Sequence, residues 1–346
     1  MNIMSHERRT HAISLLVDGL SIRATANAVD AHQDTIGRLA LHVGEGCQRL
    51  HDGLMRNLRL KRVQIDEQHS YVHTRQVNLK KYENQLPEWG EQWTFAALDV
   101  ESRAIVVWLV GKRTEENAKA FVEELRRRME SEKNLAGDVK LVVKPMIAAD
   151  GLNTYPNAIE LAFGTEITFG QLVKAKQVDE IEDKRIKRLV KAAIKEDEGR
   201  VQEHYKHAVR VPIFGNPPIE DVHTSYIERM NRTTREGSRR FVRRTTGFSK
   251  KLRHHKAAVA LQYTHYNLVR VHETLRTTPA MALKVADHVW TVRELIDQAL
   301  AAPVAPSLPP LVPPSKPDLP KHSRWHGVEP ERTIDSRKFF VYPKRT

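Results

Sequence analysis

The sequence predicts an α/β protein with an N-terminal all-α domain, a mixed β-sheet with flanking helices, and a helical C-terminal region. Three observations indicate this class. Residues 8–50 carry apolar side chains at helical spacing throughout. Residues 62–175 alternate between strand-like and helix-like patterns, and residues 176–300 are mostly helical in pattern and strongly charged. From Pro303 onward the chain is proline-rich, which ends the part that we expect to be packed.

The expected organisation is two domains and a tail, in keeping with a length of 346 residues. Residues 1–60 form the first domain, and residues 61–300 form the second, with a helical insertion around 176–210. Residues 301–346 form a proline-rich linker and a basic C-terminal tail. Eight prolines stand in the eighteen positions 303–320, so we expect extended polyproline II there.

The charge of the chain indicates a polyanionic partner. Lys and Arg number 56 against 43 Asp and Glu, a formal net charge of +13, and the pI is near 9.7. Such an excess favours nucleic acid, because each neutralised phosphate releases condensed counterions. A basic balance that serves only solubility is the alternative.

The cysteine and hydropathy patterns bear on location. A single cysteine, Cys47, excludes an internal disulfide and a cysteine-rich zinc finger, and it fits a reducing compartment. The first residues lack the apolar core of a signal peptide. The longest clean apolar stretch, 104–110, is well short of the roughly 18 residues that a membrane span needs. We therefore expect a cytoplasmic protein with no membrane partner.

The N-terminal residues show a helix-turn-helix pattern. A helix at about 9–17 ends near Gly19, Ser21 can cap a second helix at 22–29, and a short polar turn precedes a third helix. This spacing lets the later helix enter a major groove, although a three-helix bundle for protein contact has the same pattern. The side chains expected to face bases are Gln33, Asp34, Thr35 and Arg38.

The next residues predict three antiparallel strands, a helix and a further strand. The strands are expected at 63–73, 93–98 and 104–110, with a turn short enough for a hairpin between the second and third. Thr114 caps a helix that covers 117–128. A fourth strand, 139–148, leads into Asp150. This order is typical of a three-layer α/β fold with strands of mixed direction.

Two acidic residues stand where strands could bring them together. Asp66 lies inside an otherwise apolar strand, and its neighbour Glu67 should point to the other face. Asp150 ends the fourth strand, so pairing of the first and fourth strands would join it to Asp66. Two carboxylates in contact need a cation, and hard oxygen ligands favour Mg²⁺ or Mn²⁺. In the alternative, Asp66 pairs with a buried arginine, and Asp150 with Gly151 makes a routine turn.

A third acid, Glu228, lies at the start of a predicted helix that could cover this edge of the sheet. It shares a helix face with Thr224, Asn231, Arg232 and Arg235. A carboxylate flanked by amide and guanidinium groups suits metal and phosphate. Alternatively, Ser225 and Glu228 form a capping box that satisfies backbone N–H groups.

Five phrases resemble insertion-sequence DDE transposases, in particular the insertion-sequence-one type and its relatives. The likeness covers about residues 8–292, and the phrases come in the order of that family. The phrases are 63–67 (VQIDE), 93–99 (WTFAALD), 149–151 (ADG) followed by Tyr155, 224–231 (TSYIERMN) and 266–272 (YNLVRVH).

The resemblance implies a ribonuclease H-like catalytic core and a set of functional residues. By position, Asp66, Asp150 and Glu228 match the three catalytic metal ligands, and Arg235 matches a basic residue that many of these enzymes keep two turns later. Two Mg²⁺ or Mn²⁺ ions would act at phosphorus, first with water and then with the freed 3′-OH as the attacking group. The charged stretch between the second and third acids is longer than a minimal core needs.

The same resemblance implies the partners. They are double-stranded DNA, both the terminal inverted repeats of the element and the target, and a second subunit or more, because two ends must be held at once. It also implies the cytoplasm of a prokaryote, with association to the nucleoid through DNA.

A basic run follows Glu228. Residues 228–256 contain eleven Lys or Arg and two acids. Beside the third acid, such a run could follow phosphates into the site, whereas most charge runs are solvated helix faces. The residues proposed here for DNA are Arg232, Arg235, Arg239, Arg240, Arg243, Arg244, Lys250 and Lys251.

Three functions fit these patterns: an active transposase, a helix-turn-helix DNA-binding protein with inactive acids, and a ribonuclease H-like nuclease that does not join strands. Only the transposase joins a pre-cut 3′-OH end to target DNA, and only the DNA-binding protein tolerates loss of the acids.

Overall fold

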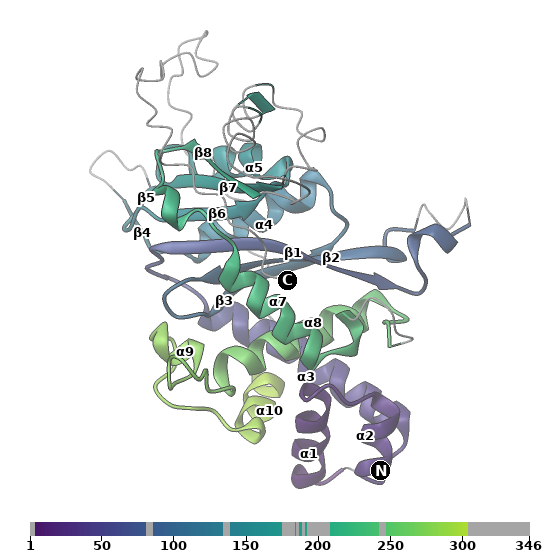
Figure 1. Cartoon of the computed structure of the whole chain (residues 1–346). Coiled ribbons are helices and arrows are strands. Elements are labelled where there is room, and N and C mark those ends of the chain that lie inside the picture. The colour runs from purple at the N-terminus through teal and green to yellow at the C-terminus, as the bar shows by residue number, and fades with distance from the viewer. Residues whose placement is uncertain are drawn as a thin grey trace.

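The structure, a computed structural model, describes residues 4–80, 86–133, 139–174, 208–241 and 247–303, with the single positions 184, 187, 188 and 191 (Figure 1). Most of the expected insertion, the tail after residue 303, Arg243 and Arg244 lie outside the described residues. Every helix of the described part is too short or too polar to cross a bilayer.

One six-stranded sheet forms the centre of the molecule, in the order β3-β2-β1-β6-β7-β8. β1, β2 and β3 form an antiparallel meander, β6 and β7 run parallel to β1, and β8 is antiparallel to β7. A separate two-stranded sheet joins β4 and β5. The strands are β1 (Arg62–Val72), β2 (Gly90–Asp99), β3 (Ile105–Gly111), β4 (Ser131–Lys133), β5 (Val139–Leu141), β6 (Met146–Asp150), β7 (Thr168–Lys174) and β8 (Ala208–Phe214).

Helices cover both faces of this sheet, so the α/β class is confirmed. Phe95 of β2 contacts Phe121 of α4 on one face, and Trp108 of β3 contacts Tyr263 of α8 on the other. Figure 1 shows α4 and α5 on one side of β1 and β2, with α7, α8 and the N-terminal helices on the other. The helices are α1 (His6–Val17), α2 (Ile22–Ala28), α3 (Gln33–Leu54), α4 (Glu115–Arg128), α5 (Thr154–Phe163), α7 (Ser225–Gly237), α8 (Leu252–Leu268), α9 (Pro279–Ala282) and α10 (Val292–Ala301), with short 3₁₀ turns η1 (Gln76–Asn78), η4 (Ile219–Asp221) and η5 (Arg239–Phe241).

Local sequence signals set several of these boundaries. The hydroxyl of Ser21 accepts the backbone N–H of Ala24 at 3.1 Å, which is the predicted cap of α2. Thr114 caps α4 in the same way. In the β2–β3 turn, Oδ2 of Asp99 accepts from both the backbone N–H and the hydroxyl of Ser102. Arg103 then adopts a φ of 62°, which lets the chain reverse into β3.

The expected fourth strand is divided into two. Residues 139–141 pair with β4 in the small sheet, and only Met146–Asp150 enter the large sheet. Pro145 stands between the two segments and has no N–H to give to a neighbouring strand, so the ladder begins after it. The prediction of one continuous strand over 139–148 is therefore wrong, although its end at Asp150 is correct.

The third helix, α3, extends beyond the apolar residues from which it was predicted and ends at Leu54. It joins the N-terminal helices to the centre of the molecule. α3 packs against α8 and α10 over its C-terminal half. Its Gly44 lies against the backbone of Ala257, and its Gly46 against that of Ala299, so closely that a Cβ atom would stand 2.2 and 2.1 Å from the respective carbonyl oxygens. Glycine is needed at both positions for this crossing.

Three histidines of α3 and α8, of which His51 and His255 are buried and His265 is half-buried, have lowered pKa values. His51 of α3 contacts the carbonyl of Ile105 at 2.9 Å and the guanidinium of Arg128 at 3.1 Å. Burial, and then the charge of Arg128, lowers the pKa of His51 well below its ordinary value. Burial lowers the pKa of His255 to about 3 and that of His265 to about 4. All three are therefore neutral in the folded protein at neutral pH.

The glycine crossing predicts an unequal response to alanine. Gly44→Ala and Gly46→Ala should each lower the free energy of unfolding by about 1–3 kcal/mol, because the added methyl overlaps backbone atoms. Gly37→Ala on the same helix, where a Cβ meets nothing within 4 Å, should leave it unchanged or raise it by about 0.5–1 kcal/mol. Urea unfolding measures the difference, and equal values for the three variants would contradict the close crossing.

The histidines predict acid sensitivity. Their pKa values are lower in the folded than in the unfolded chain, so below about pH 6.5 the unfolded chain binds more protons and is favoured. Stability should fall as the pH drops from 6.5 towards 4, by about 1.4 kcal/mol per pH unit for each histidine. The free energy of unfolding, measured with urea at several pH values in this window, should depend less steeply on pH in His255→Gln. The difference in slope should correspond to about one proton fewer taken up on unfolding. A wild-type slope in that variant would be inconsistent with a neutral, buried His255.

Candidate metal centre

Asp66 and Asp150 lie where two paired strands separate. Asp66 is in the middle of β1, and Asp150 is the last residue of β6. The parallel pairing of these strands ends with Ile65 opposite Ala149. The next residue on each strand is one of the two aspartates, so both carboxylates lie at the same opening in the sheet. The predicted pairing of the strands that carry them is confirmed.

A third carboxylate reaches this opening. One oxygen each from Asp66, Glu67 and Asp150 lies within 4.8 Å of the other two, and the described residues contain no other group of three His, Cys, Asp or Glu with this spacing. Glu67 stands opposite Phe95 in the β1–β2 register and Asp66 opposite Ala96, so the two do start from opposite faces, as the alternation along a strand predicts. The longer Glu67 side chain nevertheless brings its carboxylate to the group.

Glu67 is the most confined of the three. Its side chain is 1% exposed, and its Oε2 accepts from a guanidinium nitrogen of Arg113 at 3.1 Å. Burial raises the pKa of Glu67 well above its ordinary value, and the charges of Asp150 and Asp66 raise it further, while Arg113 opposes the shift. The buried hydroxyl of Tyr155 lies near this carboxylate, and burial followed by the charge of Glu67 raises the pKa of Tyr155.

Hydrogen bonds hold helix α7 across the same part of β1. The side-chain oxygen of Gln64 accepts the backbone N–H groups of Tyr226 and Ile227 at 3.0 and 3.1 Å, which satisfies donors in the first turn of α7. Four residues on, the amide nitrogen of Gln68 donates to the backbone carbonyl of Asn231 at 3.0 Å. Between them, the amide of Asn231 donates to Oδ2 of Asp66 at 2.8 Å. One face of β1 thus holds the helix and orients the aspartate.

Glu228 lies on this helix but is not a member of the carboxylate group. Its side chain is exposed, and its Oε1 accepts from the hydroxyl of Thr224 at 3.3 Å. α7 has no side-chain cap hydrogen bond, so the capping-box alternative with Ser225 is not present. Asn231 follows Glu228 by three residues, which places both on the same helix face. The role of Glu228 as a third ligand stays a prediction.

The donor set at the opening fits a hard divalent cation. All three side chains offer oxygen, which Mg²⁺ and Mn²⁺ prefer. Oε1 of Glu67 is buried and has no hydrogen-bond partner within the described part of the chain, so a ligand atom is left over. Asn231 supplies the kind of supporting hydrogen bond that orients a metal-binding carboxylate.

The residues proposed to contact DNA lie on two parts of the molecule. The first set is at the start of α3 and the second follows Glu228, along α7, η5 and the beginning of α8. Arg232 pairs with Glu236 at 3.1 Å, and the ammonium group of Lys250 lies 3.8 Å from the ring centre of Phe248. Exposed members are Gln33, Asp34, Arg38, Arg232, Arg239, Lys250 and Lys251, and half-buried members are Thr35, Arg235 and Arg240.

Sequence reasoning missed three residues of this centre. Gln64 and Gln68 form, with Asp66, a row of polar side chains at alternate positions of a buried strand, which is a signal for a partner on one face. For Glu67, the alternation of side chains along a strand predicts the face opposite to Asp66. That the carboxylate of Glu67 comes close to those of Asp66 and Asp150 could not be predicted from the sequence, because it depends on where the pairing of β1 and β6 ends.

The carboxylate group predicts stabilisation by divalent cations. Mn²⁺ or Mg²⁺ should raise the thermal unfolding midpoint, because a ligand that binds only the folded state stabilises it by about 2.7 kcal/mol at roughly 100 times its Kd. Asp66→Asn and Asp150→Asn should remove most of this gain. Glu101→Gln, at an exposed position in the β2–β3 turn, should keep it. The same gain in all four proteins would show that the cation binds elsewhere.

No protein-family model matches this chain, and no curated protein matches it. A function is therefore inferred from three features of the structure itself. These are the three carboxylates at the opening of the sheet, the helix fastened over Asp66, and the cationic side chains that continue from that helix.

Proposed function

We propose that the chain is a DDE transposase of the insertion-sequence type, built on a ribonuclease H-like core, that cleaves DNA at element ends and joins the 3′-OH to target DNA. The observation that carries the proposal is the meeting of Asp66 and Asp150 at the point where β1 and β6 separate, beneath a helix that binds Asp66 through Asn231. The strand order supports it as well. Three antiparallel strands followed by two strands parallel to the first put both acids at the centre of the sheet.

Asp66 and Asp150 are the residues that would hold the divalent cations, Mg²⁺ or Mn²⁺, and Glu228 is the proposed third ligand from α7. Two bound cations supply an activated attacking oxygen and stabilise the leaving oxygen during displacement at phosphorus. Glu67 differs from these acids because it is buried against Arg113. We propose that Glu67 holds the shape and charge of the site through Arg113 and that its other oxygen, Oε1, is available to the cation.

The other side chains of the site orient and bind. Asn231 fixes the position of the Asp66 carboxylate. Gln64 holds the first turn of α7, which carries Glu228. Arg232 and Arg235 follow on the same helix and offer guanidinium groups for phosphates of a DNA end, a geometry for which arginine is well suited. In this proposal the first three helices act as a helix-turn-helix module, with Gln33, Thr35 and Arg38 towards the bases.

Strand joining needs two ends held together, so we propose a dimer or a larger assembly as the working form. The net charge of +13 suits the DNA that such an assembly must bind.

The decisive assay uses DNA that carries the inverted repeats flanking the gene, with Mg²⁺ or Mn²⁺ and a plasmid target. Wild-type protein should cleave the ends and join a pre-cut 3′-OH end to the plasmid. Asp66→Asn, Asp150→Asn and Glu228→Gln should each lower both rates by roughly 10³-fold or more, since loss of a ligand removes several kcal/mol of transition-state stabilisation. Asn231→Ala should cost about 10–100-fold through the orientation of Asp66.

The matched control is Glu101→Gln, the same substitution at an exposed position in the β2–β3 turn, which should retain wild-type rates. Full activity in Glu228→Gln would remove Glu228 from the site. Cleavage by the wild-type protein without joining would indicate a nuclease, and binding of the ends without either reaction would indicate a DNA-binding protein with inactive acids.

A further inference from the structure

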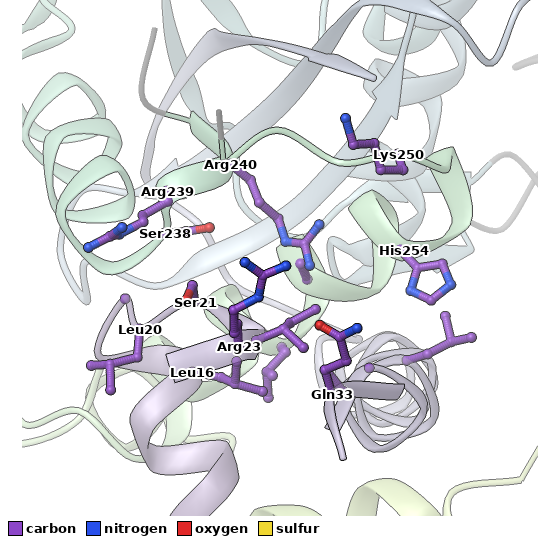
Figure 2. Close-up of a pocket in the computed structure, with 18 of the residues that line it drawn as sticks. Leu16, Leu20, Ser21, Arg23, Gln33, Ser238, Arg239, Arg240, Lys250 and His254 are labelled. Carbon is purple, nitrogen blue, oxygen red and sulfur yellow. The ribbon is translucent and has the colours of Figure 1, made fainter. Parts of the chain in front are cut away.

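A cavity of about 1020 Å³ lies between the N-terminal helices and the segment that joins α7 to α8 (Figure 2). One wall comes from the end of α1, from α2 and from the first turns of α3. The other comes from η5 and the beginning of α8. None of the three carboxylates of the metal centre lines it, so it is a separate feature of the molecule.

The lining of this cavity is strongly cationic. Among the described residues that line the cavity, Asp34 is the one acid, and six Lys or Arg residues line it from both walls. A concave surface with such an excess attracts anions and concentrates them. The six are Arg23, Arg38, Arg239, Arg240, Lys250 and Lys251.

Arg240 is the most constrained of these cations. It is half-buried, and its guanidinium donates to the hydroxyl of Ser249 at 2.6 Å. Ser249 in turn contacts the ring of His255 at 3.1 Å, and His255 stays neutral because burial lowers its pKa to about 3. Burial also lowers the pKa of Arg240 itself. Within the described part of the chain Arg240 has no acidic partner, so its positive charge is held in place by neutral groups.

A second arginine approaches from the opposite wall. Arg23 projects from the first turn of α2, and Figure 2 shows its guanidinium group and that of Arg240 pointing towards one another. Two like charges brought together in a partly enclosed space repel. An anion between them converts the repulsion into two charge-assisted contacts, and a phosphate matches the geometry of guanidinium groups.

We infer that this cavity binds the phosphate backbone of duplex DNA, with Arg240 and Arg23 contacting it from opposite walls. The inference rests on the proposed function, and it adds a second DNA contact that the N-terminal helices and the catalytic part share. The crossing of α3 with α8 holds the two walls in fixed relation. α7 leads from this site to the metal centre, since Gly237 lies six residues after Asn231, roughly 9 Å at 1.5 Å per residue.

The test is fluorescence anisotropy with a labelled random-sequence duplex, in EDTA, at a series of salt concentrations. A random sequence suffices because phosphate contacts do not depend on sequence. Arg240→Gln and Arg23→Gln should each weaken DNA binding about fivefold to tenfold at roughly 0.1 M salt. The logarithm of the association constant falls linearly with the logarithm of the salt concentration, and each substitution should make this negative slope less steep by about 1. Arg240→Lys, which keeps the charge, should retain most of the slope.

The control is Arg253→Gln on α8. Arg253 is exposed, pairs with Glu45 and does not line the cavity, so affinity and slope should stay at wild-type values. Thermal unfolding of each variant separates lost binding from lost folding, and the slope is read only from variants that unfold at the wild-type midpoint. Arg23 is exposed on α2 and lies outside the hydrogen bonds that join Arg240, Ser249 and His255, so Arg23→Gln keeps the test decisive if Arg240→Gln is unstable.

Unchanged slopes in Arg23→Gln and Arg240→Gln would overturn the inference, as would an equal loss in Arg253→Gln. A loss seen with duplex RNA but not with duplex DNA would overturn it too. No bond is cut in EDTA, so the result stands apart from the transposase proposal. A protein that never joins DNA ends could still pass this test, and an active transposase could fail it.

Discussion

Three carboxylates within 4.8 Å of one another impose the constraint on which the rest of the structure depends. Their charges repel, and in a partly buried opening water screens that repulsion poorly. The protein offsets it in part, since Arg113 pairs with Glu67 and Asn231 donates to Asp66. The buried Oε1 of Glu67 still lacks a partner among the described residues. A divalent cation would satisfy this oxygen-rich group, and in the function proposed above that cation would connect the geometry of the sheet to phosphoryl transfer.

The fold meets this constraint through strand order and one helix. Because β6 lies beside β1 and runs parallel to it, the ends of their shared ladder bring Asp66 and Asp150 to one point. Gln64 and Gln68 hydrogen-bond to the backbone of α7 and hold this helix over that point. The strand that carries Asp66 therefore also positions the helix that packs over Asp66. From α7 the chain continues directly into η5 and the cationic cavity. The helix over the metal centre and one wall of the surface proposed for DNA are thus successive parts of the chain.

Much of this could be predicted from the sequence, because the strongest signals were local. The caps at Ser21 and Thr114, the hairpin before β3 and the strand around Asp66 all follow from side-chain periodicity and hydrogen-bonding capacity. Non-local features could not be predicted in the same way. The interruption at Pro145 separates residues that read as one strand, and the reach of Glu67 depends on a ladder that ends two residues earlier on β1. The close crossing at Gly44 becomes visible only once α8 is in place.

The most direct measurement is the position of bound Mn²⁺ in a crystal of the full chain, located by its anomalous scattering. We expect density for Mn²⁺ in coordinating contact with carboxylate oxygens of both Asp66 and Asp150, with Asn231 still donating to Asp66. Saturating Mn²⁺ that leaves this opening empty, or that is bound only by residues elsewhere, would contradict the assignment of a metal centre to the separating ends of β1 and β6.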